Sequence, residues 1–480
     1  MTKPRSARLM SQMAILLAAF MIAMSGCSST TPALPPTNTP EETSVLPIPP
    51  TTNIEVPPGS PTLIYFNGII LTMDDEYPQA QAIALAEDKI LALGSDEDIL
   101  AVQVPGTRII DLQGSTLMPG FVDTHSHLFN SASSDPDTGN LEKAQELALQ
   151  NGITTLGNMY TSSDFLEEMR SFDESGGLLV RTSLYMVYTN PCGELQGDWF
   201  RRYPPTYQPG EILRIGGVKI FTDGGSCGYP ALSFERATGG MGDLWFTQEE
   251  LDTMVADIDL AGYQVAIHAI GDRAVDQALN AFESTLDGKP NILRHRIEHN
   301  ATVRPDSYPR YQEIGVVASL WGNIWSCKDV FHNLGIVPDP PENQAWNFPY
   351  RAMWDASPEA HFAWQTDYPW NSINPLFHMY SLVTARDIGG DGSECPDPAW
   401  FGNRTLTLEE ALPMMTIDGA YALFREQEVG SLVPGKYADL IILSGNPASD
   451  LDAIRDLKVW MTMVGGRVVW CAPGHEDICP

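Results

Sequence analysis

The feature that most constrains the fold is an alternation of short apolar segments with helical patterns through the middle of the chain. Two of the intervening helices begin with capping boxes, at Thr247 and Thr407, and Gly152 is placed to end a helical run. Strict alternation favours parallel pairing of the strands, and eight units favour closure into a (β/α)8 TIM barrel. A doubly wound open sheet is the alternative that periodicity leaves open. The eight expected strands cover residues 120–127, 153–159, 178–188, 216–222, 264–268, 293–299, 315–320 and 361–367.

Both ends of the folded body differ from this middle because they are rich in strand-like runs. Asn67-Gly68 and Gly465-Gly466 are turn signals inside two of these runs. The barrel is therefore expected over residues 118–429, between β-rich segments at 62–117 and 430–480. The runs themselves cover residues 62–73, 81–93, 108–117, 438–443 and 457–470.

The N-terminal residues are typical of an export signal. A positively charged start is followed by an apolar run at 13–24, which is too short to span a bilayer. The next residues end in Ser25-Gly26-Cys27 and resemble the bacterial lipobox, in which the cysteine is lipidated; an ordinary signal peptide is the alternative. Residues 28–61 are dominated by Pro, Thr and Ser, which predicts an extended tether. We expect a signal peptide and lipobox at 1–27, and a bacterial membrane lipoprotein whose catalytic domain is extracytoplasmic.

Charge and cysteine content narrow the range of partners. The formal net charge of −33 argues against a nucleic-acid partner, which would require clustered Lys and Arg. It also disfavours contact between the folded body and anionic lipid, so a lipid anchor is the only membrane contact expected. The cysteines that follow Cys27 fit no zinc-ribbon or CxxC spacing and are interpreted as structural, with Cys471 and Cys479 expected to pair.

Polar residues end four of the eight predicted strands. His125 and His127 end the first, and residues two apart on a strand point to the same face. His268 ends the fifth, Glu298-His299 the sixth and Asp367 the eighth. Each has an ordinary explanation by itself, such as a hydrogen-bonded polar residue or an Asp that opens a turn before proline. Together they fall where barrel enzymes carry their catalytic groups.

Imidazole and carboxylate groups suit zinc and similar divalent metals, which acidify the water that they bind. The sequence therefore predicts a site for one or two divalent ions, expected to be zinc. Its ligands are His125, His127, His268, His299 and Asp367.

Long, ordered stretches of the sequence carry a family resemblance. They include LMPGFVDTHSH at 117–127, HAIGDRA at 268–274 and RHRIEH at 294–299; others lie at 218–224, 366–369, 430–440 and 464–469. Over these stretches the chain resembles the amidohydrolase superfamily and, within it, the YtcJ-like branch of the amidohydrolase-3 group. The resemblance implies a TIM barrel flanked by a small β-sandwich that both chain ends build.

The resemblance also changes the interpretation of Lys219, which lies within the fourth predicted strand. By itself Lys219 would be a buried cation paired with Asp223. In many relatives a lysine at this position carries CO2 as a carbamate and bridges two metals, so a binuclear site is expected. Carbamylation requires a neutral amine, so burial must lower the pKa of Lys219. Asp367 matches the family's strand-eight acid, which would bind a metal and accept a proton from the bridging water.

Other residues are candidate substrate contacts. Arg273 could bind a substrate carboxylate or make a surface salt bridge. Trp321, Asn323 and Trp325 follow the seventh strand and could line the pocket or pack. YtcJ-like enzymes usually carry a long insertion after the first strand, whereas only about a helix separates His127 from the second strand here. The pocket is therefore expected to be more open or differently built.

These observations predict a metal-dependent hydrolase that uses metal-activated hydroxide to cleave the C–N bond of an amide, formamide or cyclic amide. A first alternative keeps the site but cleaves an ester, lactone or phosphoester. A second is a non-catalytic, solute-binding lipoprotein, against which the complete ligand set counts. The expected partner is a small-molecule substrate, and the sequence leaves the oligomeric state open.

Overall fold

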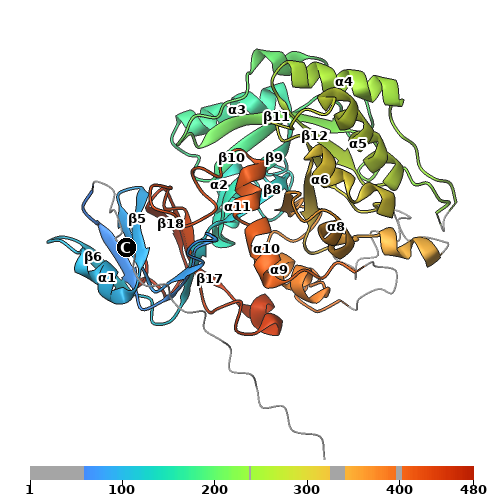
Figure 1. Cartoon of the computed structure of the whole chain (residues 1–480). Helices are drawn as coiled ribbons and strands as arrows, with labels where there is room; N and C mark the ends of the chain where they lie inside the picture. Colours follow the sequence, from blue (N-terminus) through green and yellow to red (C-terminus); the bar gives the residue numbers. More distant parts are fainter. Residues whose placement is uncertain (1–58, 237–238, 325–340, 396–402) are drawn as a thin grey trace, which may run out of the picture. The chain divides into compact units, whose positions relative to one another are not determined.

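The structure is a computed structural model that describes residues 59–236, 239–324, 341–395 and 403–480 (Figure 1). The predicted signal peptide, Cys27 and nearly all of the predicted tether lie outside these residues, as does Trp325. Across the described ranges, no helix has the length and apolarity needed to cross a membrane.

The largest sheet contains eight strands that follow one another in chain order. Every hydrogen-bonded pair of neighbours is parallel, from β8 with β9 through to β14 with β15. Each strand lies within about three residues of a predicted one, so the expected order of barrel strands is confirmed. The strands are β8 (Phe121–Ser126), β9 (Ile153–Thr161), β10 (Arg181–Val187), β11 (Leu213–Phe221), β12 (Gln264–Ala269), β13 (Arg296–His299), β14 (Val317–Trp321) and β15 (Phe362–Gln365).

Hydrogen bonds join the first and last strands and close this sheet into a TIM barrel. Thr124 Oγ1 donates to the carbonyl of Trp364 (2.7 Å), and the backbone N–H of Asp367 donates to the carbonyl of His125 (2.8 Å). The side chain of Asp123 accepts from the backbone N–H of Thr366 (2.9 Å). The C-terminal ends of β8 and β15 are thereby held together, which brings the predicted ligands of both strands to one mouth.

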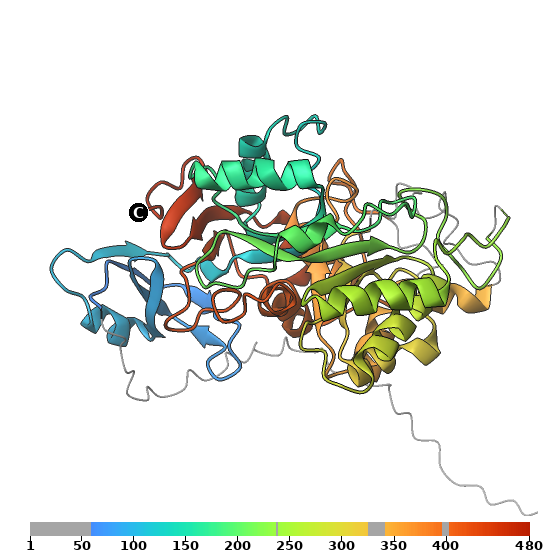
Figure 2. The same ribbon diagram turned by 90° about the horizontal axis from the view of Figure 1, so that it is seen from above.

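Helices connect most of the strands, and α4 and α5 pack side by side against the sheet (Figure 2). Both predicted capping boxes form, at Thr247 before α4 and at Thr407 before α10. Between β10 and β11 the connection holds only the short 3₁₀ turn η1 (Trp199–Arg202). The α-helices of the barrel region are α2 (Leu141–Gln150), α3 (Ser163–Glu174), α4 (Gln248–Leu260), α5 (Asp272–Leu286), α6 (Arg310–Ile314), α8 (Tyr350–Ala356), α9 (Pro375–Thr384), α10 (Leu408–Met414) and α11 (Ile417–Ala422).

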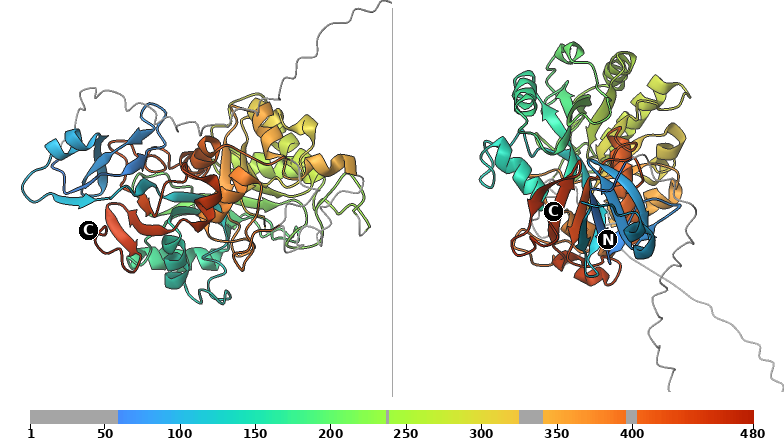
Figure 3. Two further views of the ribbon diagram at one scale, coloured as in Figure 1. Left: turned by 90° about the horizontal axis from the view of Figure 1, so that it is seen from below. Right: turned by 90° about the vertical axis from the view of Figure 1, so that its left-hand side faces the viewer.

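Two smaller sheets are built from the β-rich ends of the chain. The six-stranded sheet has the order β18-β17-β16-β7-β2-β3, so N-terminal and C-terminal segments pair in it (Figure 3). The four-stranded sheet β5-β4-β1-β6 consists of N-terminal strands alone. The helix α1 (Asp96–Ala101) packs against this sheet. The strands are β1 (Leu63–Phe66), β2 (Ile69–Leu71), β3 (Gln79–Ala80), β4 (Ala82–Ala86), β5 (Lys89–Gly94), β6 (Arg108–Asp111), β7 (Thr116–Pro119), β16 (Leu440–Leu443), β17 (Val459–Val464) and β18 (Arg467–Cys471).

The long N-terminal runs of the sequence each divide into two strands. Asn67 has a φ of 56°, a left-handed value that favours Asn and Gly, and it separates β1 from β2. Gln113 and Gly114 have φ values of 52° and 83° and separate β6 from β7. Each break sends the chain from the four-stranded sheet into the six-stranded one, so these two turns build the sandwich.

Buried side chains support both parts of the fold. The sandwich buries an apolar cluster that includes Tyr65, Ile83 and Leu440. Inside the barrel, Val122 and Tyr185 pack against Leu423 from the segment after α11. Disulfides join Cys192 to Cys227 and, as predicted, Cys471 to Cys479.

Candidate metal centre

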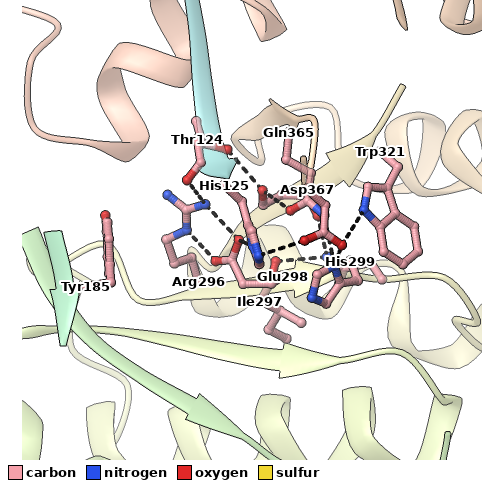
Figure 4. Close-up of polar contacts among 12 residues, drawn as sticks. Thr124, His125, Tyr185, Arg296, Ile297, Glu298, His299, Trp321, Gln365 and Asp367 are labelled. Carbon is pink, nitrogen blue, oxygen red and sulfur yellow. Dashed lines mark hydrogen bonds and ion pairs between the residues drawn. The ribbon is translucent and has the colours of Figure 1, made fainter. Parts of the chain in front are cut away.

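Three of the predicted ligands meet at the C-terminal mouth of the barrel. His125 Nε2 lies 3.3 Å from His127 Nε2. It also lies 3.3 Å from Asp367 Oδ1, and Figure 4 shows these two side chains facing each other. His127 Nε2 lies 3.4 Å from the same carboxylate oxygen. One ligand atom from each residue falls within 4.8 Å of the other two, so a single ion could contact all three. The HxH spacing on β8 and the Asp after β15 converge as the sequence predicted.

His299 reaches this cluster through an unusual backbone conformation. Adjacent residues of a strand normally face opposite sides, yet both Glu298 and His299 contact His125. His299 has a φ of 78° and Asp367 a φ of 58°, values that non-glycine residues rarely adopt. These turns bring His299 Nδ1 to 3.7 Å from Asp367 Oδ2. The amide nitrogen of Gln365 lies 2.9 Å from the same His299 atom.

His268 lies at the edge of the cluster. Its ring centroid is 4.5 Å from that of His299 and 5.1 Å from that of Phe221. Its Nε2 faces the carbonyl of Gly224 at 3.1 Å and Asp223 Oδ1 at 3.4 Å. His268 therefore contacts His299, which in turn contacts His125 of the three-ligand cluster.

Lys219 occupies the barrel interior and is fully buried. Its Nζ makes no hydrogen bond to any described residue. It does not pair with Asp223, whose carboxylate accepts from the backbone N–H groups of Ala231, Ile270 and Gly271 at 2.8–3.1 Å. An ion pair between Lys219 and Asp223, the simpler explanation of this lysine, is therefore excluded.

Burial governs the protonation of the centre. It lowers the pKa of Lys219 to about 8, although Glu298 and Asp367 oppose that shift. Burial also lowers the pKa values of His127 and His299, and that of His268 to about 3. These three imidazoles are consequently neutral, which is the form that binds metals. Although burial acts to raise it, His125 and His127 hold the pKa of Asp367 well below its usual range.

An ion pair lies beneath His125. The carboxylate of Glu298 accepts from Arg296 at 2.5 and 2.9 Å and lies 2.8 Å from His125 Nδ1. Both partners are completely buried. The sequence analysis noted Glu298 at the end of the sixth predicted strand but missed Arg296. The signal was the Arg-x-Glu spacing on β13, which places both side chains on one face of the strand.

The predicted substrate contacts lie in different surroundings. Trp321 borders the centre, since its Nε1 donates to Asp367 Oδ2 (3.3 Å) and its ring centroid is 4.7 Å from that of His299. Asn323 is buried and exchanges hydrogen bonds with the backbone of Ile388. Arg273 is in the first turn of α5, with its guanidinium 3.5 Å from the carbonyl of Gly242. It lines a surface cavity between α4 and α5.

The residues present fit a divalent ion. Two imidazoles and a carboxylate converge on one point, and this donor set suits zinc and related metals. The buried amine of Lys219 adds a polar atom without a hydrogen-bond partner in the described structure, close enough to Asp367 to interact electrostatically.

Comparison with known proteins assigns the chain to a family. A model described as "Amidohydrolase family" matches residues 135–470, more than half of the chain. The chain belongs to the amidohydrolase family. The barrel, the sandwich and the metal-ligand pattern agree with this membership, which confirms the resemblance seen in the sequence.

The individual relatives share less than a third of their aligned residues with this chain. The chain is 28% identical over 270 residues to the N-substituted formamide deformylase of Arthrobacter pascens, covering 53% of this chain and 45% of that protein. It is 26% identical over 281 residues to the putative amidohydrolase YtcJ of Bacillus subtilis strain 168, covering 54% and 48%. The chain thus spans about half the length of these curated relatives. An uncharacterized metal-dependent hydrolase from Pyrococcus horikoshii OT3 shares the fold, with a TM-score of 0.67, 21% identity, and coverage of 82% of this chain and 99% of that one.

Proposed function

We propose that this amidohydrolase is a metal-dependent hydrolase that cleaves the C–N bond of a small amide, formamide or cyclic amide. The observation that carries the proposal is the convergence of His125, His127 and Asp367 within 4.8 Å at the barrel mouth. The sequence similarity to a relative named as a formamide deformylase supports the choice of bond. The retained ligand set argues against a solute-binding protein without activity.

In this proposal His125, His127 and Asp367 hold one divalent ion, expected to be zinc, and His268 and His299 contribute to a second. A divalent ion bound there would lower the pKa of water and polarise a carbonyl group. The neutral state of His127, His268 and His299 supports this assignment because protonated histidine cannot act as a ligand.

Asp367 is the proposed general base. Its Oδ2 accepts a hydrogen bond from Trp321, and its Oδ1 faces the two histidines of β8. It takes a proton from the attacking water, whose oxygen bonds to the carbonyl carbon. When the C–N bond breaks, Asp367 returns that proton to the leaving nitrogen. Glu298 is less suited to this role because Arg296 and His125 already engage its carboxylate.

Lys219 is proposed to carry CO2 as a carbamate and to join two ions. Its burial supports this assignment, because a pKa near 8 leaves roughly a tenth of the amine neutral at pH 7. Because no described residue forms a hydrogen bond to its Nζ, addition of CO2 to the amine would break no such bond.

The function is tested by metal analysis followed by a substrate screen. Purified protein is expected to contain zinc, and N-formyl amines and cyclic amides should be hydrolysed, with activity lost in chelator and restored by zinc. Esters, lactones and phosphoesters are screened in parallel. Preferential turnover of one of these would replace the C–N assignment, and metal-free protein without any turnover would refute the hydrolase.

We also propose that the chain is an exported lipoprotein anchored through Cys27. The disulfides Cys192–Cys227 and Cys471–Cys479 support export, because structural disulfides persist in oxidising compartments.

A further inference from the structure

The ring of His125 is contacted on two sides by different groups. Its Nε2 faces Asp367 and His127, the partners expected to share an ion, while its Nδ1 lies 2.8 Å from Glu298. A carboxylate can only accept a hydrogen bond, so Nδ1 carries the proton and Nε2 presents its lone pair to the cluster. The contact with Glu298 therefore fixes both the tautomer and the direction of the ring (Figure 4).

Glu298 is itself held in place by Arg296. The Nε and Nη2 of the guanidinium donate to the two carboxylate oxygens at 2.5 and 2.9 Å. Nη2 also donates to the carbonyl of Thr124 (3.1 Å), the residue that precedes His125. One guanidinium thus ties the carboxylate under the ring to the backbone that carries the ring. Burial of all these groups makes other rotamers costly, because a displaced charge would lose its partner.

We propose that Glu298 and Arg296 act together as positioning residues for His125, setting the affinity of the centre for its ion. This inference rests on the proposed function, since it assigns to the ion a ligand whose orientation these residues control. Neither residue touches the substrate or the ion. Carboxylates that orient ligand histidines typically change metal affinity by about 10–100-fold when removed.

Glu298→Gln is the decisive variant because it keeps the shape of the side chain. The glutamine has no charge, and its amide nitrogen must face either Arg296 or His125 Nδ1–H, both of which are donors. Arg296→Lys is the second variant, since it keeps the charge but loses the bidentate geometry. Zinc dissociation constants are measured by competition with a chromogenic chelator, with X-ray absorption to count the zinc ligands.

A matched control is available away from the candidate metal centre. Arg181, at the start of β10, and Asp439, just before β16, form another buried pair with contacts of 2.6 and 3.0 Å. Asp439→Asn should lower stability as much as or more than Glu298→Gln while leaving zinc affinity unchanged. It therefore separates a general loss of stability from a loss of ligand orientation.

The expected result is zinc binding that is about 10–100-fold weaker in Glu298→Gln, with a smaller loss in Arg296→Lys and an unchanged number of zinc ligands. Wild-type affinity in Glu298→Gln would overturn the inference while leaving the hydrolase intact. The loss of one oxygen ligand would also overturn it, because Glu298 would then be a ligand. A wild-type protein that binds no zinc would overturn both the inference and the proposed function.

Discussion

Replacing Lys219 with methionine should stabilise the metal-free protein while impairing its metal centre. Lys219 is completely buried, and no described residue forms a hydrogen bond to its Nζ. Methionine has similar length and no charge, and its flexible side chain adapts to irregular space. The variant therefore removes a buried ammonium and leaves the barrel filled.

The size of the effect follows from the depressed pKa. Burial lowers the pKa of Lys219 from 10.5 to about 8, against the attraction of Glu298 and Asp367. At about 1.4 kcal/mol for each tenfold change in acidity, this difference makes folding of the charged form about 3 kcal/mol less favourable. The cost is fully present below pH 8. It disappears as the pH rises towards 10.5, because the folded state then releases its proton before the unfolded state does.

The assay is denaturant unfolding in chelator and CO2-free buffer, at intervals between pH 6 and pH 10.5. Lys219→Met should be about 3 kcal/mol more stable than the wild type at pH 7, and the difference should fade above pH 8. Lys143→Met, at an exposed position of α2, controls for exchange of a surface lysine. With zinc and bicarbonate supplied, the variant should hold one ion or none.

Two results would refute this reasoning. Lower stability of Lys219→Met at pH 7 would mean that Glu298 and Asp367 stabilise the ammonium by more than burial destabilises it. A stability difference that stayed constant up to pH 10.5 would mean that packing, rather than charge, distinguishes the two proteins.

Other predictions concern the ligands, the base and the anchor. His125→Ala and His268→Ala should each reduce bound zinc, measured by elemental analysis, with circular dichroism unchanged; full metal content with full activity would contradict the site. Asp367→Asn should lower kcat by at least ~10²-fold, as expected when a general base is lost. Turnover near that of the wild type would assign the base to another group. Mass spectrometry should find a mature N-terminus at an acylated Cys27, and an unmodified N-terminus further along the chain would rule out the anchor.

The barrel could be predicted from sequence because its strands are buried on both faces. Such strands appear as continuous apolar runs, and the capping boxes at Thr247 and Thr407 mark where helices begin. The pairing of strands in the sandwich was harder to predict from the sequence. Residues 108–117 form one strand-like run, yet Gln113 and Gly114 divide it between two sheets. The choice of partner strand depends on contacts distant in sequence, which local periodicity does not encode.

The convergence of the candidate metal ligands could be predicted for a related reason. The parallel strands of a barrel all end at one mouth, so polar residues at strand ends converge without any further information. The contacts that orient these residues, such as that of Glu298 with His125, were harder to infer. Alternation of side chains predicts that Glu298 and His299 point in opposite directions, whereas the left-handed φ of 78° at His299 lets both contact His125. Backbone strain of this kind is stored at functional sites and leaves little trace in residue patterns.

The charges inside the barrel connect the state of Lys219 to the number of ions. In the metal-free protein Lys219 and Arg296 are cationic and Glu298 and Asp367 are anionic, so these four side chains together carry no net charge. Two divalent ions would add four positive charges in a medium where uncompensated charge is costly. Conversion of Lys219 from ammonium to carbamate removes two of these charges without moving any side chain to a new position. We therefore expect carbamate and second ion to appear together, so that a titration followed by native mass spectrometry shows no two-ion form that lacks bound CO2.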